Sequence, residues 1–374
     1  IASFSDDWDA MSRCLVVRVL ILYHVVVHSW GLVPTSSPSP YRGGTTLQMS
    51  GLFGEATNQD RRSGPSVNWQ IYVDQSKPSL DRGASMTLDA FCSLSPPDKV
   101  QVISAVLPKS NKKTPWIRCI SKIPGRSSID VANVDSVDKV YRILTKHLQI
   151  QVSRDACTCL KWKYKGNGHM EAGKVNLAID AYNKAIEKCI TGSKQEGVIL
   201  LLRASAYSKQ AQSHQEALQQ IVQDWRLPDR KDIQFLLSEA LVGGPERTGL
   251  ANSILNKLQS DGKRQQTELR KIQYRHGLYQ YALLHATQDA LRATELLPSY
   301  SASWLRAGEL LSQLWKLKES KQYYDKALSL DPSLASSLES DFGDLKRRQS
   351  LLEQVKASKD WAEDSLRLAL DVAG

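Results

Sequence analysis

The sequence predicts a mainly helical protein, in which a small α+β domain precedes an α-solenoid of stacked helical hairpins. Three observations support this fold class. From residue 157 onward, side chains recur at helical spacing, and part of the pattern repeats after thirty-four residues. Between residues 66 and 124, apolar and polar residues alternate instead, as they do in half-buried strands. Residues 1–60 show neither pattern and are predicted to be disordered.

Composition excludes several classes of protein. The chain has 374 residues, of which 41% are apolar and 24% charged, as in a globular protein and unlike a disordered or collagen-like one. Its formal charge of +10 permits an acidic partner, such as an acidic peptide, nucleic acid or a membrane surface. The six cysteines form no C-x-x-C pair, so the sequence predicts reduced thiols and neither a metal site nor a cofactor.

Residues 1–60 have the composition of a targeting segment. From Met11, a short basic start leads into an apolar stretch, Cys14–Trp30, which is shorter than the ~20 residues of a membrane span and fits a signal-peptide core. The residues that follow are rich in Ser, Thr, Pro and Gly, and no acidic residue occurs between Met11 and Gly54, as in transit peptides. The two parts resemble the bipartite presequence of algae with secondary plastids, such as diatoms. This resemblance implies plastid import and no membrane span in the mature protein; the secretory pathway or an uncleaved signal anchor are the alternatives.

A small α+β domain is predicted at residues 66–150. The apolar residues of its first strand are Val67, Trp69, Ile71 and Val73. The β-rich runs 99–108 and 114–124 are separated by a short polar stretch, which predicts a hairpin with a longer loop. Helical spacing then returns, and Ser136 or Asp135 can cap the start of a helix. The stripe of this helix consists of Val137, Val140, Tyr141, Leu144 and Leu148.

Positive charge is concentrated in residues 99–126 of this domain. Between Lys99 and Ile129 the sequence contains several Lys and Arg residues and no Asp or Glu. Such a segment can contact phosphates, and an aromatic ring within it can stack on a base. It predicts, as an alternative function, an RNA-binding accessory factor. The residues that would bind are Lys109, Lys112, Lys113, Trp116 and Arg118. Lysines at a solvated sheet edge, where they prevent edge-to-edge association, would give the same pattern.

The string GHMEAGKV, residues 168–175, has the glycine and lysine spacing of a phosphate-binding loop. Such a loop also requires a buried strand before it and a Ser or Thr after the lysine. Here the preceding residues, CLKWKYKGN, have the pattern of a charged helix, and the last position is Val175. The string therefore indicates a turn between two helices, with Gly173 in the left-handed backbone conformation.

The hairpin around this turn resembles the tetratricopeptide repeat. Side chains recur at helical spacing on both sides of the turn: Leu160, Tyr164, Asn167 and Met170 before it, and Ala178, Tyr182, Ala185 and Cys189 after it. The family's positions are matched by Trp162, Gly166, Gly173, Ala178, Tyr182 and Ala185. At His169 the family usually has Tyr or Phe. The resemblance implies a right-handed solenoid, because one hairpin alone cannot bury its apolar stripe.

Further copies bring the prediction to about five helix pairs within residues 157–334. The four later copies lie at 198–222, 232–259 (degenerate), 267–300 and 301–334. The last two share a register, since Pro298 and Pro332 are thirty-four residues apart. Residues 335–374 are predicted to form capping helices, which the last repeat needs to cover its apolar side.

The resemblance implies a non-enzymatic function. Tetratricopeptide proteins hold a peptide or a partner helix in a concave groove lined by the first helix of each pair. The sequence therefore predicts a protein–protein interaction scaffold, an assembly factor or a co-chaperone. No catalytic pattern such as H-E-x-x-H or G-x-S-x-G occurs in it.

One subfamily suggests binding residues. Co-chaperones of the carboxylate-clamp type grip the acidic C-terminal tail of a heat-shock chaperone with Lys, Asn and Arg side chains from several repeats. The residues here that match such a set are Lys163, Asn167, Lys231 and Arg306. Other clamp positions fall on Leu202, Phe235 and Ala302, which cannot donate the required hydrogen bonds. A solvated lysine at 163 and an asparagine at 167 that bonds a neighbouring backbone would equally explain the first pair.

Overall fold

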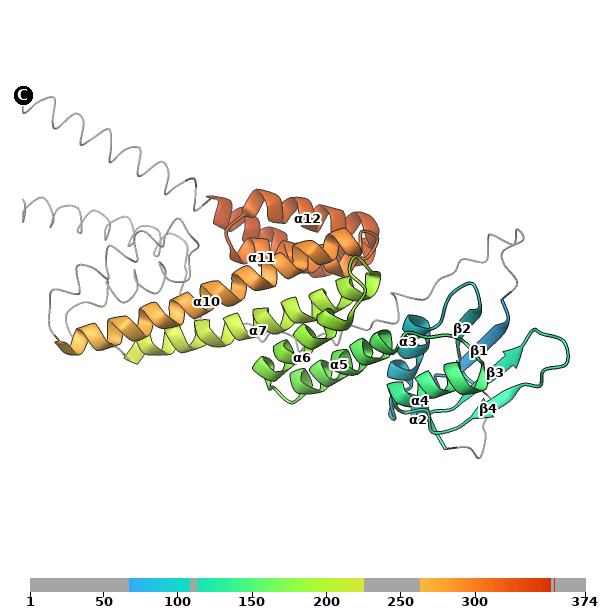
Figure 1. Ribbon diagram of the computed structural model, residues 1–374. Helices are drawn as coiled ribbons and strands as arrows, with labels where there is room; N and C mark the ends of the chain where they lie inside the picture. The colour runs from blue at the N-terminus through green and yellow to red at the C-terminus, as the bar shows by residue number, and fades with distance from the viewer. Residues whose placement is uncertain (1–66, 108–112, 225–262, 351–352, 354–374) are drawn as a thin grey trace, which may run out of the picture. The chain divides into compact units, whose positions relative to one another are not determined.

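The computed structural model describes residues 67–107, 113–224, 263–350 and 353 (Figure 1). The four strands lie within residues 69–131, with two helices between the first and the second, and the remainder is almost entirely helical. The targeting segment predicted at 1–60 and the degenerate repeat predicted at 232–259 lie outside the described residues, as does most of the capping segment beyond 350. Plastid import accordingly stays a prediction.

The strands form one mixed sheet in the order β2-β1-β3-β4. They are β1 (Trp69–Asp74), β2 (Val100–Ala105), β3 (Ile117–Ser121) and β4 (Ile129–Val131). Strand β1 pairs in parallel with β2 and antiparallel with β3. The hairpin expected between 99–108 and 114–124 is therefore wrong, because β1 lies between the two runs. A parallel neighbour requires a crossover, which helices α2 (Lys77–Leu80) and α3 (Ala84–Leu94) supply.

Helices cover one face of the sheet. The side chains of β1 that point to this face are Trp69, Ile71 and Val73, in the predicted alternation, and all three are buried. They belong to one core with Phe91 of α3 and Val140 of α4 (Val137–Arg142). On the other face, the amide of Gln70 donates a hydrogen bond to Gln101 across the strand pair at 2.8 Å. The α+β part is thus two-layered, with a single apolar core.

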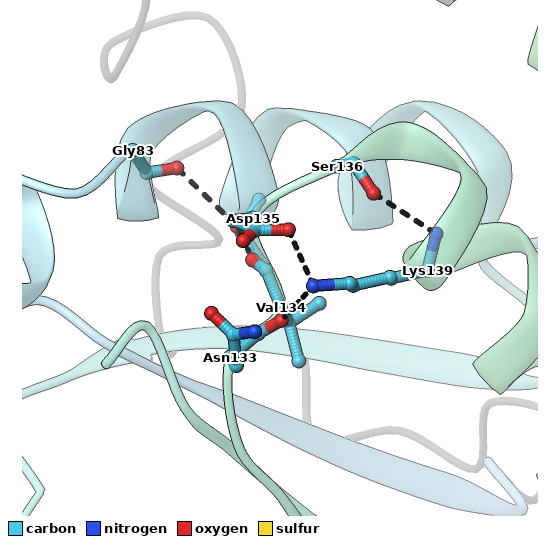
Figure 2. Close-up of polar contacts among 7 residues, drawn as sticks. Gly83, Asn133, Val134, Asp135, Ser136 and Lys139 are labelled. Atoms are coloured by element: carbon cyan, nitrogen blue, oxygen red, sulfur yellow. Dashed lines mark hydrogen bonds and ion pairs between the residues drawn. The ribbon is translucent and has the colours of Figure 1, made fainter. Parts of the chain in front are cut away.

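Polar contacts of residues 133–136 fix the start of α4 (Figure 2). The Ser136 hydroxyl accepts a hydrogen bond from the backbone N–H of Lys139, which is the cap that the sequence predicts. The Lys139 ammonium lies 2.7 Å from the Asp135 carboxylate and donates to the Asn133 carbonyl at 2.8 Å. The side chain of Val134 is fully buried, and its carbonyl accepts a hydrogen bond from Thr87 of α3. Residues 133–136 therefore connect α4 to α3 through this hydrogen bond.

Two helical hairpins use the same close crossing. The first consists of α5 (Arg154–Glu171) and α6 (Val175–Lys188), and the second of α11 (Ser301–Gln313) and α12 (Leu317–Leu330). A Cβ atom added to Gly308 would lie 2.7 Å from Cδ1 of Tyr324, and one on Gly166 would collide with the ring of Tyr182 in the same way. The absence of a side chain at each crossing therefore lets a tyrosine ring of the second helix pack against the backbone of the first.

The middle of the repeat region does not form the predicted hairpins. Helix α7 (Lys194–Asp224) continues through the turn expected within 198–222, and α10 (Lys263–Leu296) continues through the one expected within 267–300. A physical reason lies at the crossing position. In 267–300 this position is Tyr274, thirty-four residues before Gly308 of the second hairpin. A tyrosine side chain there occupies the space that Gly308 leaves for the ring of Tyr324.

The two long helices run antiparallel, side by side, and pair with each other (Figure 1). Their buried side chains recur every seven residues: Ala204, Ala211 and Leu218 in α7, and Ile272, Tyr279, Ala286 and Ala293 in α10. A seven-residue repeat keeps one stripe of each helix facing the other, as in a coiled coil. Alanine at many of these positions allows a close approach of the helix axes. The alanines that suggested a repeat at 267–300 belong instead to this seam.

The residues that follow α12 cover the second hairpin. A short turn, η4 (Pro332–Leu334), leads into helical residues 335–350. Leu338 and Leu345 from this helix are buried against Leu317 and Tyr324 of α12. Within the described residues, this segment therefore takes the capping position that the sequence predicts.

Candidate protein-interaction surface

Side-chain contacts join α7 to α10 at several positions. Arg203 of α7 makes two hydrogen bonds to the Asp289 carboxylate, at 2.7 and 2.6 Å, and a third to the Asn183 side chain of α6 at 2.7 Å. Burial alone would lower the pKa of Arg203, but the hydrogen bonds and charge of Asp289 raise it. Both the guanidinium and the carboxylate are largely shielded from water. This charge pair therefore fixes the register of three helices.

Aromatic rings make further contacts along the same two helices. His285 stacks on Tyr207 of α7 with ring centroids 5.4 Å apart, and it contacts Tyr281 at 4.2 Å. Farther along, Arg275 lies within hydrogen-bond distance of the His214 ring, at 3.4 Å. Partial burial and the charge of Arg275 lower the pKa of His214.

A stripe of exposed side chains lies beside these contacts on α10. Tyr274, Tyr281 and Leu284 are 67%, 56% and 50% exposed, which is unusual for large side chains on a packed helix. Gly277 lies on the same face, since the four positions are spaced by three, four and three residues. A Cβ atom on Gly277 would meet no other atom within 4 Å, so the backbone is bare at this point. We call these four residues the α10 stripe.

The first hairpin places the predicted clamp residues Lys163 and Asn167 in contacts within the protein. The Lys163 side chain is 3% exposed, and its ammonium lies 2.6 Å from the Asp89 carboxylate of α3. The Asp89 carboxylate also accepts a hydrogen bond from the Tyr164 hydroxyl. Asn167 accepts a hydrogen bond from the Tyr182 hydroxyl at 2.9 Å. The expectation of an open cation at position 163 is therefore wrong: Asp89 already neutralises this lysine.

Of the other two clamp residues, Arg306 alone lies within the described part of the chain. Arg306 of α11 is half-buried and forms an ion pair with Glu309, one turn along the same helix, at 2.7 Å. Lys231 lies outside the described residues. Binding of an acidic tail by Arg306 or Lys231 stays a prediction.

The basic segment 99–126 is only partly described. Lys109 and Lys112 lie outside the described residues, and Lys113 is exposed. Trp116 is 3% exposed, so its ring is not available to stack on a base in this structure. Arg118 is paired with Asp130 of the neighbouring strand through two hydrogen bonds, at 2.9 and 3.1 Å. The acidic residue that balances this arginine lies just beyond the segment that the sequence marked as purely basic.

Sequence reasoning missed the α10 stripe. The repeat pattern predicts two helices within 267–300, and with a turn in this segment Tyr274 and Tyr281 would not share one helix face. The available signal was the seven-residue spacing of Ile272, Tyr279 and Ala286, which already accounts for the buried side of one long helix. Large side chains that fall outside such a buried repeat are candidates for a second contact surface.

Residues 301–334 match the family model described as Tetratricopeptide repeat. The match coincides with α11, α12 and η4, the hairpin in which Gly308 faces Tyr324. A search of curated proteins found no match. The chain therefore contains a tetratricopeptide-type repeat, and this type of repeat supports a role in protein–protein interaction.

Two further searches concern only the described part of the chain. Among those residues, no group of His, Cys, Asp and Glu side chains has the arrangement to hold a metal ion. In the same residues, no helix combines the length and apolar character needed to cross a membrane.

Proposed function

We propose that this chain is a non-enzymatic protein-interaction module that binds an acidic, amphipathic helix of another protein along the α10 stripe. The observation that carries the proposal is the stripe itself. Two tyrosines and a leucine, each half or more exposed, flank a glycine that no described residue covers. Apolar side chains at helical spacing around a bare backbone are the surface on which a second helix packs closely.

Charge favours an acidic partner over a basic one. By sequence, α10 carries an excess of cations: Lys263, Arg264, Arg270, Lys271, Arg275 and Arg292 against Glu268, Asp289 and Glu295. The whole chain has a formal charge of +10. Opposite charges on the two partners speed association and set orientation, while the buried rings contribute most of the affinity.

This mode of binding differs from the carboxylate clamp. A clamp needs cations that are free to receive a peptide carboxylate, and Asp89 already holds the ammonium of Lys163. The α10 stripe instead offers ring surface, of which Tyr and Trp supply much of the energy at protein interfaces. Scaffold, assembly and co-chaperone functions are all compatible with such a surface.

The test uses a synthetic helix with leucines on one face and glutamates on the flanks, and a matched peptide with lysines on the flanks. The acidic peptide should bind the full chain and slow hydrogen exchange around 274–284. Tyr281→Ala should weaken binding by about tenfold or more. Leu284→Ala should weaken it too, whereas Leu177→Ala, a leucine 49% exposed on α6, should not.

Three results would overturn the proposal. One is equal binding of the lysine-flanked peptide, which would leave no role for charge. The second is an equal loss of affinity in Leu284→Ala and Leu177→Ala, because the α10 stripe would then have no special part. The third is no binding by either peptide. Binding of a short RNA that is lost on charge reversal of Lys112 and Lys113 would point to the nucleic-acid alternative instead.

A further inference from the structure

The first hairpin brings two cysteines together at its open end. Its helices cross where Gly166 meets the ring of Tyr182, and Cys159 and Cys189 each lie seven residues, or about two helical turns, outward from that crossing. In an antiparallel pair, equal steps from a crossing lead to facing positions. Both residues pack in the same apolar cluster, and each sulfur shifts the pKa of the other. Both are free thiols.

The two thiols differ in exposure. Cys159, on α5, is completely buried, whereas Cys189 is half-buried and caps the end of α6. The sulfur of Cys189 also contacts the Ser193 hydroxyl at 3.4 Å, and that hydroxyl caps the start of α7 by accepting a hydrogen bond from the backbone N–H of Glu196. A reagent in water can therefore reach Cys189 but not Cys159.

We propose that Cys159 and Cys189 form an oxidisable dithiol, in which Cys189 reacts first with a hydroperoxide and Cys159 then closes a disulfide between α5 and the end of α6. An accessible thiol beside a buried second thiol is the arrangement used by redox-sensing cysteine pairs. The site requires no metal and no cofactor, and it lies apart from the α10 stripe in sequence.

The reaction balances with a hydroperoxide as the only oxidant. The Cys189 thiolate attacks one peroxide oxygen, so that an S–O bond forms, the O–O bond breaks, and the departing hydroxide takes up a proton to leave as water. The Cys159 sulfur then attacks the Cys189 sulfur. An S–S bond forms, the S–O bond breaks, and the released hydroxide leaves as water with the Cys159 proton. The two thiols lose two electrons, and the peroxide gains them.

The surroundings favour the thiolate at Cys189 over that at Cys159. The hydrogen bond from Cys159 is the largest influence and lowers the pKa of Cys189 to about 7, against burial and the Glu196 charge, which raise it. Ser193 and the backbone N–H of Ile190 also lower it. The same hydrogen bond and burial raise the pKa of Cys159, which the charge of Lys163 lowers in part. At pH 7, Cys189 therefore carries more thiolate than a cysteine with the ordinary pKa of 9.0.

The experiment treats the folded, full-length chain with one equivalent of hydrogen peroxide, blocks the remaining thiols with N-ethylmaleimide, and maps tryptic peptides. The expected product joins DACTCLK (155–161) to CITGSK (189–194), and fragmentation should assign the bond to Cys159 rather than Cys157. Cys119 serves as an internal control, since it is fully buried and burial raises its pKa to about 12, and it should become alkylatable only after unfolding.

A pair of variants separates a reactive dithiol from a merely structural contact. Cys189→Ser should abolish the cross-link and leave Cys159 reduced, and circular dichroism should show that the helices persist. In Cys159→Ala, the pH at which Cys189 alkylates at half its maximal rate should rise, because the hydrogen-bond donor that lowers its pKa is gone. The proposal is overturned if Cys189 is oxidised to a sulfinic acid without a cross-link, or if the bond forms equally with Cys157.

Discussion

Replacing Gly308 by alanine probes the crossing on which the last hairpin depends. The new Cβ atom would lie 2.7 Å from Cδ1 and 2.8 Å from Cε1 of Tyr324, closer than Cβ atoms approach other atoms in proteins. The Tyr324 ring is 2% exposed and contacts Phe342 edge-on at 5.7 Å, so it has no free space into which it can turn. The two helices must therefore move apart.

The sign of the effect follows from two opposing contributions. Overpacking of a core costs about 1–3 kcal/mol. Alanine is favoured over glycine in a helix by about 1 kcal/mol. The difference is about 0–2 kcal/mol, and because the Tyr324 ring has no space to move we expect its upper part, a loss of about 1–2 kcal/mol in the free energy of unfolding. Gly277→Ala is the matched control, because this glycine also lies within a helix but has no atom within 4 Å of a new Cβ. It should gain about 0.5–1 kcal/mol.

Urea unfolding followed by far-ultraviolet circular dichroism measures both variants, and hydrogen exchange in α11 and α12 shows where stability changes. In a Tyr324→Leu background the Gly308→Ala penalty should disappear, since the ring is gone. A Gly308→Ala protein as stable as the wild type would refute the crossing argument, as would a penalty of the same size in Gly277→Ala.

Three further predictions concern the first hairpin and the α+β part. Lys163→Met should lower the stability measured by thermal unfolding by about 3–5 kcal/mol, because it leaves the Asp89 charge unpaired where the two side chains are 3% and 12% exposed. Adding Asp89→Asn should recover most of this loss. A Lys163→Met protein as stable as the wild type would contradict the role of the pair. Burial would raise the pKa of Asp74, but hydrogen bonds from Ser79, Ser76 and the Leu107 backbone lower it below the ordinary 3.8. The stability that the ionised carboxylate contributes is therefore present above pH 3.8, and it is lost as the pH falls through the pKa of Asp74 in the folded protein. Asp74→Asn should therefore destabilise the protein at pH 6 by more than at pH 3 in urea unfolding, and a constant difference would contradict this sign. Gly173→Ala should cost about 1 kcal/mol because φ is 71° there. Gly168→Ala, at a helical position with nothing within 4 Å, should be neutral or stabilising, and equal effects in the two glycine variants would refute the backbone argument.

The sequence predicted the features that depend on near neighbours along the chain. The alternation at 67–73 appears as β1, Ser136 caps α4, and Gly173 takes the left-handed conformation in the first turn. The pattern at 301–334 predicted a hairpin, and the family model matches the same residues. Each of these features is decided within a few residues by backbone geometry or by one apolar face, so local spacing carries the information.

The partners of charged side chains could not be predicted in this way. The ammonium of Lys163 is neutralised by a carboxylate seventy-four residues earlier, and Arg203 by one eighty-six residues later. The residues near Lys163 and Arg203 in the sequence do not indicate these partners. The expectation of an open clamp at 163 failed for this reason.

By itself, then, the sequence determined the first strand, the cap of α4, the turn of the first hairpin, and that the last hairpin is of the tetratricopeptide type. Only the tertiary structure decided that β1 lies between β2 and β3, and that α7 and α10 remain whole and pair with each other. It also decided that Tyr274, Tyr281 and Leu284 are left exposed. The physical reason is that strand order, helix continuity and exposure depend on contacts between remote segments, whose combined packing outweighs the local preferences that a sequence pattern reports.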